Sequence, residues 1–557
     1  MAERLRKRPR HLGLHNGGMI ITGDPISHLI PIEPAAMEGR TVTQFDKEGL
    51  EQLGIVKIDL LGLRMLSAIA DTVSALKQQG KTVHLDRLDF RDRRVYDRIC
   101  SAQTVGIFQV ESGAQVSVIP HLQPRCFQDL VVEVSLIRPG PLQGNMVRPY
   151  IRRRQGVEPV TYLHPSLRPA LDETLGVIVF QEQVIKIARD FAGFTAGRGE
   201  LLRRALGHKD AGEELQKFRA EFVEGALGRG VHPKTAQNVW QMIAGFAGYS
   251  FSKAHAAAFA VIVYWSAWLR VYHPVEYFCG LLRHAPLGTY PANVLESEAR
   301  RSGIKFLPFD VNRSQAKATV ESDAIRFGLE YVKGIGEERA EAIVQICGNK
   351  PFHSLAEFIQ RTELERRAIE SLILAGAFDT FGERPACPTC LSADRADRRQ
   401  LLWDLAEAFE IARRPAPLPL DIPDEQASLL PMPPEQKLAL TFATTGVTAG
   451  PHLVEIRRDA FTRAGCIPYP ELLKMRNGAK VKVGGLVADG LRRPPTAKGV
   501  GFIRLDTPDG IADAVVPPQV YAECREALRS AFIVVDGVLR KSGVSITVVA
   551  DRVAPLP

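Results

Sequence analysis

The spacing of apolar residues changes several times along this 557-residue chain, so one regular pattern cannot describe all of it. Residues 1–66 carry short β-rich runs divided by glycine and proline, whereas residues 67–285 carry apolar residues at spacings of three and four. The length also exceeds what a single hydrophobic core usually serves. We therefore predict a multidomain α+β protein.

The middle of the chain predicts helical hairpins followed by a linker. A polar connecting segment occupies residues 286–323, and two compact helical hairpins are expected over residues 324–380. Residues 381–477 include Pro415–Pro434, which is rich in proline and acidic residues and is typical of an extended linker.

The last 80 residues, 478–557, return to a strand-like pattern. A helix-like stretch at Pro518–Leu528 separates the third strand from the fourth. This order predicts a small Greek-key barrel of the OB type. The OB pattern alone indicates binding of single-stranded nucleic acid and docking of a protein about equally well. The five strand-like runs are Lys480–Val487, Gly501–Asp506, Ile511–Val516, Ala531–Leu539 and Ser545–Val549.

The composition indicates the cellular compartment in which the chain is expected to function. The longest nearly apolar stretch, Ala256–Leu269, is shorter than the roughly 18 residues of a membrane span, so we expect a buried core helix and no membrane association. Eight cysteines at scattered spacings make no disulfide framework, which favours a reducing cytoplasm. The net charge of +8 permits a polyanionic partner without indicating one.

The most specific motif is Val332-Lys-Gly-Ile-Gly-Glu-Glu-Arg-Ala-Glu-Ala-Ile343, a helix-hairpin-helix signature. Gly334 and Gly336 allow a sharp bend that presents backbone N–H groups to a phosphate oxygen, and Lys333 adds positive charge. In a second predicted hairpin, Arg366 and Arg367 could face the same phosphates. This pattern favours DNA binding without sequence preference, the alternative being an ordinary glycine turn between packed helices.

Two further patterns involve candidate metal ligands. Lys57 and Asp59 lie two residues apart in a β-branched run, so their side chains share one face of the strand. Together they could form either a metal–phosphate site or a surface ion pair. The pair Cys387 and Cys390 invites a zinc assignment, but a structural site needs four ligands and no second pair follows. We interpret these cysteines as free thiols in a loop.

Further strings along the chain carry one common resemblance. They are His15-Asn-Gly-Gly-Met, Lys57-Ile-Asp-Leu-Leu-Gly-Leu, Gly106-Ile-Phe-Gln-Val-Glu-Ser, Arg138-Pro-Gly-Pro-Leu-Gln, Phe180-Gln-Glu-Gln-Val, Leu202-Arg-Arg-Ala-Leu-Gly and Phe251-Ser-Lys-Ala-His-Ala-Ala-Ala-Phe. Together they resemble the C-terminal half of the C-family bacterial DNA polymerases, the alpha subunit of DNA polymerase III and its error-prone paralogue. Leu122-Gln-Pro-Arg-Cys-Phe-Gln-Asp-Leu is similar to the error-prone branch.

The resemblance implies two-metal nucleotidyl transfer with Mg²⁺ and three palm carboxylates, acting on a DNA primer-template and deoxynucleoside triphosphates. Residues 1–66 would be a partial palm and residues 67–285 the fingers. Asp59 matches the third carboxylate, and the resemblance implies that it is catalytic and binds metal. The implied nucleotide-binding residues are Lys57, Arg203, Arg204, Lys253 and His255, although the last two could equally support packing of the apolar helix.

The chain also departs from the family. The other two carboxylates belong to a Pro-Asp-x-Asp-x-Asp motif that is absent from this sequence. Asp86, Asp89 and Asp92 follow Asp59 on an arginine-rich segment and are interpreted as a solvated face. Gly113 stands where the family often has arginine, which removes a phosphate contact.

Gln426-Ala-Ser-Leu-Leu430 resembles the short peptide by which family members dock on the sliding clamp. Leu429 and Leu430 would be its apolar anchors. We predict a truncated or split error-prone polymerase, inactive alone, with a separately encoded N-terminal half as a candidate partner. The rival interpretation is a non-catalytic remnant that binds DNA and the clamp.

Overall fold

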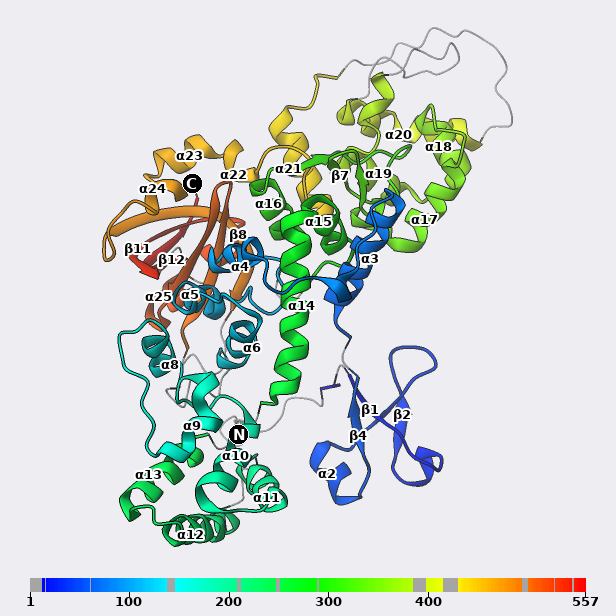
Figure 1. The fold of residues 1–557 in the computed structure, drawn as a ribbon. Coiled ribbons are helices and arrows are strands. Elements are labelled where there is room, and N and C mark those ends of the chain that lie inside the picture. The colour runs from blue at the N-terminus through cyan, green and yellow to red at the C-terminus, as the bar shows by residue number, and fades with distance from the viewer. Residues whose placement is uncertain are drawn as a thin grey trace, which may run out of the picture. The chain divides into compact units, whose positions relative to one another are not determined.

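The structure is a computed structural model that divides the chain into two compact units, residues 1–66 and residues 67–557 (Figure 1). Each unit is described by itself. The described residues are 13–15, 17–60, 62–137, 146–207, 212–246, 251–287, 290–383, 397–413, 429–492, 499–524, 526–542 and 545–556.

The first unit consists of two small antiparallel ribbons. Strand β1 (Gly18–Ile20) pairs with β4 (Lys57–Asp59), and β2 (Ile32–Pro34) pairs with β3 (Thr41–Thr43). A short helix, α2 (Lys47–Gln52), precedes β4 and is capped by Asp46, whose carboxylate accepts from the N–H of Gly49. Two-stranded ribbons are marginal by themselves. Among described residues 13–60, Ile30 and Leu50 are the large hydrophobic residues that are buried.

The second unit is organised around a long buried helix, α14 (Lys253–Tyr272). It packs against α4 (Arg93–Cys100) and α6 (Phe127–Leu136). By length and composition, α14 is the one helix among the described residues that would suit a membrane span, but half of its apolar stretch is buried inside the protein. The expected core helix is therefore present. Neighbouring helices are α3 (Arg64–Gln78), α5 (Gly113–Leu122), α15 (Pro274–Arg283) and α16 (Ala292–Arg301).

A second helical core lies within residues 146–246. Aromatic rings fill it: Phe222 stacks on Phe191 with ring centroids 5.6 Å apart and contacts Trp240 at 5.5 Å. The mostly helical character predicted for residues 67–285 is confirmed. The helices are α8 (Val147–Arg154), α9 (Arg168–Leu171), α10 (Gln181–Ala192), α11 (Ala196–Gly207), α12 (Gly212–Gly228) and α13 (Pro233–Ala244).

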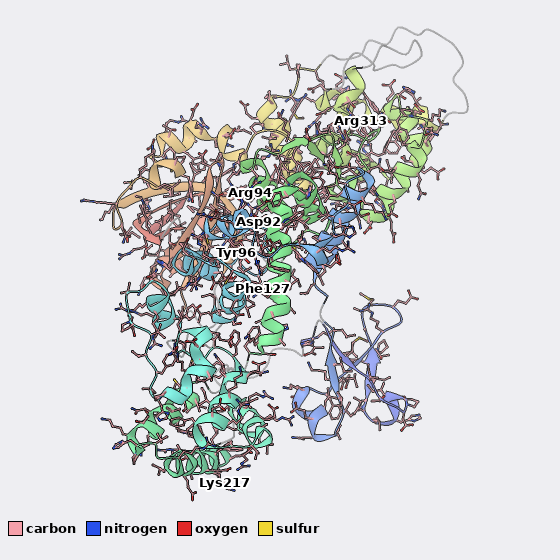
Figure 2. The ribbon with its side chains drawn as sticks, viewed as in Figure 1. Asp92, Arg94, Tyr96, Phe127, Lys217 and Arg313 are labelled. Carbon is pink, nitrogen blue, oxygen red and sulfur yellow. The ribbon has the colours of Figure 1, made fainter. Side chains whose placement is uncertain are left out.

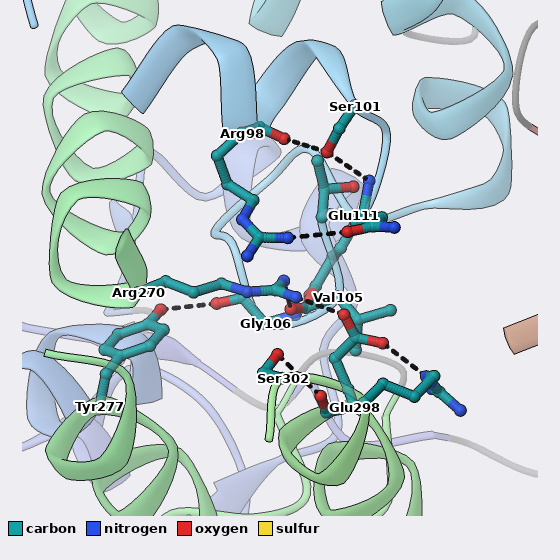
Figure 3. Close-up of polar contacts among 12 residues, drawn as sticks. Arg98, Ser101, Val105, Gly106, Glu111, Arg270, Tyr277, Glu298 and Ser302 are labelled. Carbon is teal, nitrogen blue, oxygen red and sulfur yellow. Dashed lines mark hydrogen bonds and ion pairs between the residues drawn. The ribbon is translucent and has the colours of Figure 1, made fainter. Parts of the chain in front are cut away.

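The string that begins at Gly106 forms a turn held by buried polar contacts (Figure 3). The N–H of Gly106 donates to Glu111 Oε2 at 3.0 Å, and Tyr277 Oη donates to the carbonyl of Gly106 at 2.5 Å. Arg270 of α14 donates to Val105 and Glu298 in the same place. Burial raises the pKa of Glu111 to about 7. In this chain the string therefore fixes the packing of α14, α15 and α16.

The region predicted as two helical hairpins differs at its start. Ala324–Arg326 is strand β7 of a three-stranded sheet with β5 (Lys305–Leu307) and β6 (Thr319–Glu321), not a helix. Ile325 and Arg326 are buried between neighbouring strands, and this pairing outweighs local helix propensity. The helical elements that follow are η5 (Leu329–Tyr331), α17 (Gly336–Cys347), α18 (Leu355–Thr362) and α19 (Arg366–Ala375).

The predicted linker, residues 381–477, is largely helical where it is described. Helix α20 (Arg398–Arg413) buries Leu401 and Leu405 against α18, and this packing stabilises it. The extended linker itself was predicted at Pro415–Pro434, of which only residues 429–434 are described. Cys387 and Cys390 lie outside the described residues. The later helices are α21 (Pro434–Thr445), α22 (Leu453–Ile456), α23 (Arg458–Arg463) and α24 (Tyr469–Leu472).

The C-terminal barrel is closed, as predicted, with strand order β10-β12-β11-β8-β9. One helix, α25 (Pro518–Glu523), lies between the third and fourth strands. The barrel is fixed to α16 by Asp506, which is fully buried and pairs with Arg301 at 2.9 Å and His452 at 3.3 Å. The strands are β8 (Lys480–Arg492), β9 (Gly501–Thr507), β10 (Gly510–Val516), β11 (Phe532–Ser542) and β12 (Ser545–Pro555).

Candidate nucleotide-binding and DNA-binding sites

Lys57 and Asp59 lie on one face of β4, as their spacing predicts. Lys57 Nζ donates to Asp59 Oδ1 at 2.7 Å, and this hydrogen bond lowers the pKa of Asp59. Gly18 of β1 lies opposite Asp59, and a Cβ there would come within 3.2 Å of Lys57 Cδ. The absence of a side chain at Gly18 therefore leaves room for the lysine to reach its partner.

The described residues contain no group of three or more His, Cys, Asp or Glu side chains that could hold a metal ion. The side chain of Asp59 is 48% exposed, and Nδ1 of His15 lies 3.8 Å from its Oδ1. One carboxylate cannot offset the repulsion of two divalent cations. Asp59 by itself therefore does not fit a two-metal site.

The later aspartates have local structural roles. Asp92 caps α4 by accepting from the N–H of Arg94 at 2.9 Å, and it also accepts from Tyr272 Oη of α14 at 2.6 Å. Figure 2 shows Asp92 and Arg94 at the start of α4. Asp89 accepts from the N–H of Arg91 at 3.0 Å, and Asp86 is exposed. Asp92 is thus a helix cap, whereas the solvated-face interpretation remains suitable for Asp86.

Arg203 and Arg204 of α11 share one carboxylate partner, Glu200. Arg203 donates two hydrogen bonds to its carboxylate, from Nη2 at 2.7 Å and from Nε at 2.8 Å. Arg204 donates one from Nε at 3.0 Å. Hydrogen bonds from Arg203 lower the pKa of Glu200 to about 2. The carboxylate is therefore ionised at neutral pH, and it fixes both guanidinium groups on one surface of α11.

Lys253 and His255 occupy the first turn of α14. The N–H of Lys253 donates to both oxygens of Glu182 at 3.0 and 3.1 Å, while its ammonium pairs with Glu173. The ring of His255 lies between Phe251 and Phe259, with centroids 5.3 and 4.1 Å away. Glu182 thus caps α14, and His255 is part of an aromatic stack, in agreement with the packing interpretation.

The polar residues of the string Phe180-Gln-Glu-Gln-Val join these helices. Gln181 accepts from Arg203 Nη1 at 3.2 Å, and its N–H donates to the carbonyl of Phe251 at 3.0 Å. Gln183 accepts from the N–H groups of Val179 and Phe180 at 2.8 and 3.0 Å. The start of α10 therefore makes hydrogen bonds to both α11 and the start of α14. We call Arg203, Arg204 and Lys253, together with their glutamate partners, the cationic cluster.

The glycine turn of the hairpin has the predicted backbone. Gly334 and Gly336 have φ of +87° and +67°, and open space lies where a Cβ would stand. Lys333 is exposed, but its ammonium already donates to the carbonyl of Ala443 at 2.5 Å, and its N–H donates to Thr444 at 3.1 Å. It therefore satisfies the C-terminal carbonyls of α21 and keeps two ammonium donors for another partner.

The second hairpin is tied to this turn by a residue that the sequence did not single out. Arg339 Nη1 donates to the carbonyl of Gly334 at 2.8 Å and to Glu365 Oε1 at 2.9 Å. Arg366 pairs within its own helix with Glu370 at 3.0 Å, and Arg367 is exposed. Arg339 fixes the glycine turn against the start of α19.

The candidate clamp peptide is held at its C-terminal end by α20. The N–H of Leu429 donates to Gln400 Oε1 at 3.2 Å, and the carbonyl of Leu430 accepts from Arg399 at 2.9 Å. The side chain of Leu430 is 80% exposed. Gln426 lies outside the described residues. These backbone contacts leave one of the two predicted anchors fully presented to solvent.

Sequence reasoning missed four residues that organise the cationic cluster: Glu173, Gln181, Glu182 and Glu200. Glu200 could have been found, because it precedes Arg203 and Arg204 by three and four residues, the spacing of helical ion pairs. Glu173 and Glu182 lie 80 and 71 residues before Lys253, and no local pattern connects them.

Comparison with known proteins covers all of these regions. The bacterial DNA polymerase III alpha subunit finger domain matches residues 65–230, and the bacterial DNA polymerase III alpha NTPase domain matches residues 1–62. A helix-hairpin-helix motif matches residues 303–386.

Curated relatives match the whole chain. Error-prone DNA polymerases of Corynebacterium glutamicum and Mycobacterium tuberculosis are each 39% identical, and that of Corynebacterium efficiens is 40% identical. In each case the match covers 100% of this chain and 50 or 51% of the relative. This chain therefore spans about half the length of the relatives that it matches. It is similar to the bacterial DNA polymerase III alpha subunit over residues 1–62 and 65–230, and to error-prone DNA polymerases along its whole length.

Proposed function

We propose that this chain forms the fingers, hairpin and barrel portion of an error-prone DNA polymerase, together with one strand pair of the palm. The complete enzyme would add deoxynucleotides to a primer under the direction of a template. The observation that carries the proposal is that α10 makes hydrogen bonds both to Arg203, inside the finger-domain match, and to the backbone N–H of Lys253, beyond it.

Arg203 and Arg204 would bind the triphosphate of the incoming nucleotide. A guanidinium group offers five N–H donors in a planar fork that suits phosphate oxygens. Because Glu200 remains ionised, it would orient both arginines before the nucleotide arrives. Lys253 would add charge from the start of α14, where backbone N–H groups also favour an anion.

Asp59 would supply one of the palm carboxylates, and Lys57 would orient it. When bound, Mg²⁺ would neutralise the charge that develops on the reacting phosphate. Since Asp59 alone does not fit a two-metal site, the other carboxylates would have to come from the half of the polymerase that this chain does not match. The chain alone is then expected to be inactive.

The hairpin region and the Leu429–Leu430 segment would hold DNA and the sliding clamp. Positive-φ glycines and the exposed Lys333 support phosphate contacts, and the exposed Leu430 supports docking in an apolar pocket. Because these regions are complete here while the palm ribbon is not, a non-catalytic remnant that binds DNA and the clamp is the second candidate.

Primer extension distinguishes the two candidates. The full chain, mixed with the unmatched half of the Corynebacterium glutamicum relative, should extend a primer in the presence of magnesium, whereas the chain alone should not. Asp59→Asn and Arg203→Ala should each abolish extension by the mixture. A mixture that binds DNA but never extends a primer would favour the remnant.

A further inference from the structure

The ribbon of β1 and β4 has one charged face and one apolar face. Lys57 and Asp59 point to the first, beside Gly18 and His15. Met19 and Ile58 are direct cross-strand partners on the other face. Because side chains alternate along a strand, the neighbours two residues away extend that second face. The apolar face consists of Met19, Ile21, Val56, Ile58 and Leu60.

All five side chains of the apolar face are exposed, between 39% and 65%. Eleven of the twenty-one exposed large hydrophobic residues in the described part of the chain lie between residues 14 and 60, less than a tenth of its length. Scattered apolar side chains are normal on a protein surface, but a contiguous group marks an interaction site. The apolar face has no cation that could bind phosphate, so nucleic acid does not suit it.

The described residues of the first unit, 13–15, 17–60 and 62–66, leave this face exposed. Its ribbons bury little beyond Ile30 and Leu50, and a segment this short rarely forms a stable core alone. The relatives have about as much chain again as the part matched here. From these observations, and resting on the proposed function, we propose that the apolar face is the docking surface for the polypeptide that carries the unmatched half of the polymerase.

This assignment places the partner on the side of the ribbon opposite Asp59. The partner would bury Ile58 and its neighbours with an apolar surface of its own, and the carboxylate would remain open to nucleotide and metal. Docking would thereby give the ribbon the core that it lacks. A second copy of this chain is the competing occupant, and its binding would overturn the assignment.

Calorimetric titration of the full chain with the unmatched half of the Corynebacterium glutamicum polymerase tests the docking surface. No DNA, nucleotide or magnesium is present, so binding is measured apart from catalysis. We expect a one-to-one complex, and Ile58→Glu and Val56→Glu should each weaken it about tenfold or more. Val56 is 65% exposed, so its replacement should leave the fold intact even where Ile58→Glu does not.

Two control variants sharpen the titration. Leu227 on α12 is 42% exposed, close to the value for Ile58, and Leu227→Glu should not change the affinity. Asp59→Asn, on the charged face, should also leave binding unchanged while abolishing primer extension.

The alternative results have distinct meanings. Absence of binding by the parent chain, equal affinities for all variants, or a self-association in sedimentation that Ile58→Glu removes would each overturn the assignment. Binding at the apolar face without any primer extension would instead contradict the proposed function alone.

Discussion

The first unit and the helical core of residues 146–246 use apolar residues in opposite ways. Between residues 14 and 60 most large hydrophobic side chains are exposed, whereas Phe191, Phe222 and Trp240 stack in a closed interior. The helical core of residues 146–246 can therefore hold Arg203 in place by its own packing. Around Asp59, the described residues of the first unit leave most of the apolar side chains exposed. The residues proposed for nucleotide binding and for metal binding thus lie on differently packed frameworks.

The largest expected effect is on stability and separates the two regions directly. Phe222→Ala should lower the free energy of unfolding by about 3–5 kcal/mol, because it opens a cavity in an aromatic cluster. Ile58→Ala should change it by less than about 0.5 kcal/mol, since Ile58 is exposed. All four tryptophans lie in the second unit, so urea unfolding of the full chain is followed by hydrogen–deuterium exchange, which reports on each unit separately. Equal losses would show that the first unit has a core of its own.

The next largest effect on stability is expected at a buried carboxylate in the helical region. Glu133 on α6 is buried, and neither carboxylate oxygen has a hydrogen-bond partner. Burial raises its pKa to about 8, against about 4.3 in the unfolded chain. The unfolded chain therefore loses this proton first, and stability falls as pH rises from about 4.5 to about 8.

Glu133→Gln removes that dependence. At pH 9 the variant should be more stable than the parent by on the order of 1–3 kcal/mol, and at pH 4.5 the two should be nearly equal. Thermal unfolding at both pH values provides the measurement. A gain at pH 4.5 as large as that at pH 9 would disprove the titration of Glu133.

DNA binding tests whether the hairpin region is complete without the palm. The double variant Gly334→Val, Gly336→Val should bind duplex DNA about tenfold more weakly, because β-branched residues resist positive φ. Gly230 also has positive φ and open space around it, so Gly230→Val is the matched control and should not affect affinity. Fluorescence anisotropy at several salt concentrations should give a steep salt dependence for the parent. Unchanged affinity in a folded double variant would disprove phosphate binding at this turn.

The smallest effect on stability is expected in the clamp peptide. Replacing Gln426, Leu429 and Leu430 by alanine should change the free energy of unfolding by less than about 0.5 kcal/mol, since Leu430 is exposed. Binding to a sliding clamp should nevertheless be lost in a calorimetric titration. Leu473→Ala removes an equally large exposed side chain elsewhere and should leave clamp binding intact. Clamp binding by the triple variant would rule the peptide out.

Regions with a clear local pattern were predictable from the sequence. The barrel was found because strict alternation and one intervening helix define its order, and the hairpin turn because only glycine suits its positive φ. The helices near Pro434 and Pro470 were missed because their prolines were taken as linker residues. Proline is favoured at the first turn of a helix, and here it begins α21 and α24.

The arrangement of the cationic cluster needed tertiary structure. The resemblance named Arg203 and Lys253, but Gln181 and Glu182 act across about 22 and 71 residues of chain. The apolar face of the ribbon was also not predicted from the sequence, because Met19 and Ile58 become neighbours only through the register of β1 and β4. An apolar strand residue is normally assigned to a core, and its exposure can be seen only in the folded unit.

Hydrogen–deuterium exchange on the full chain tests the contrast between the two units most directly. In the chain alone, the amides of β1 and β4 should exchange far faster than those of α10 and α12, because a marginal ribbon opens readily. Addition of the unmatched polymerase half should slow exchange in β1 and β4 and leave α10 and α12 unchanged. Protection of β1 and β4 in the chain alone, equal to that of α10, would contradict the claim that the first unit is incomplete.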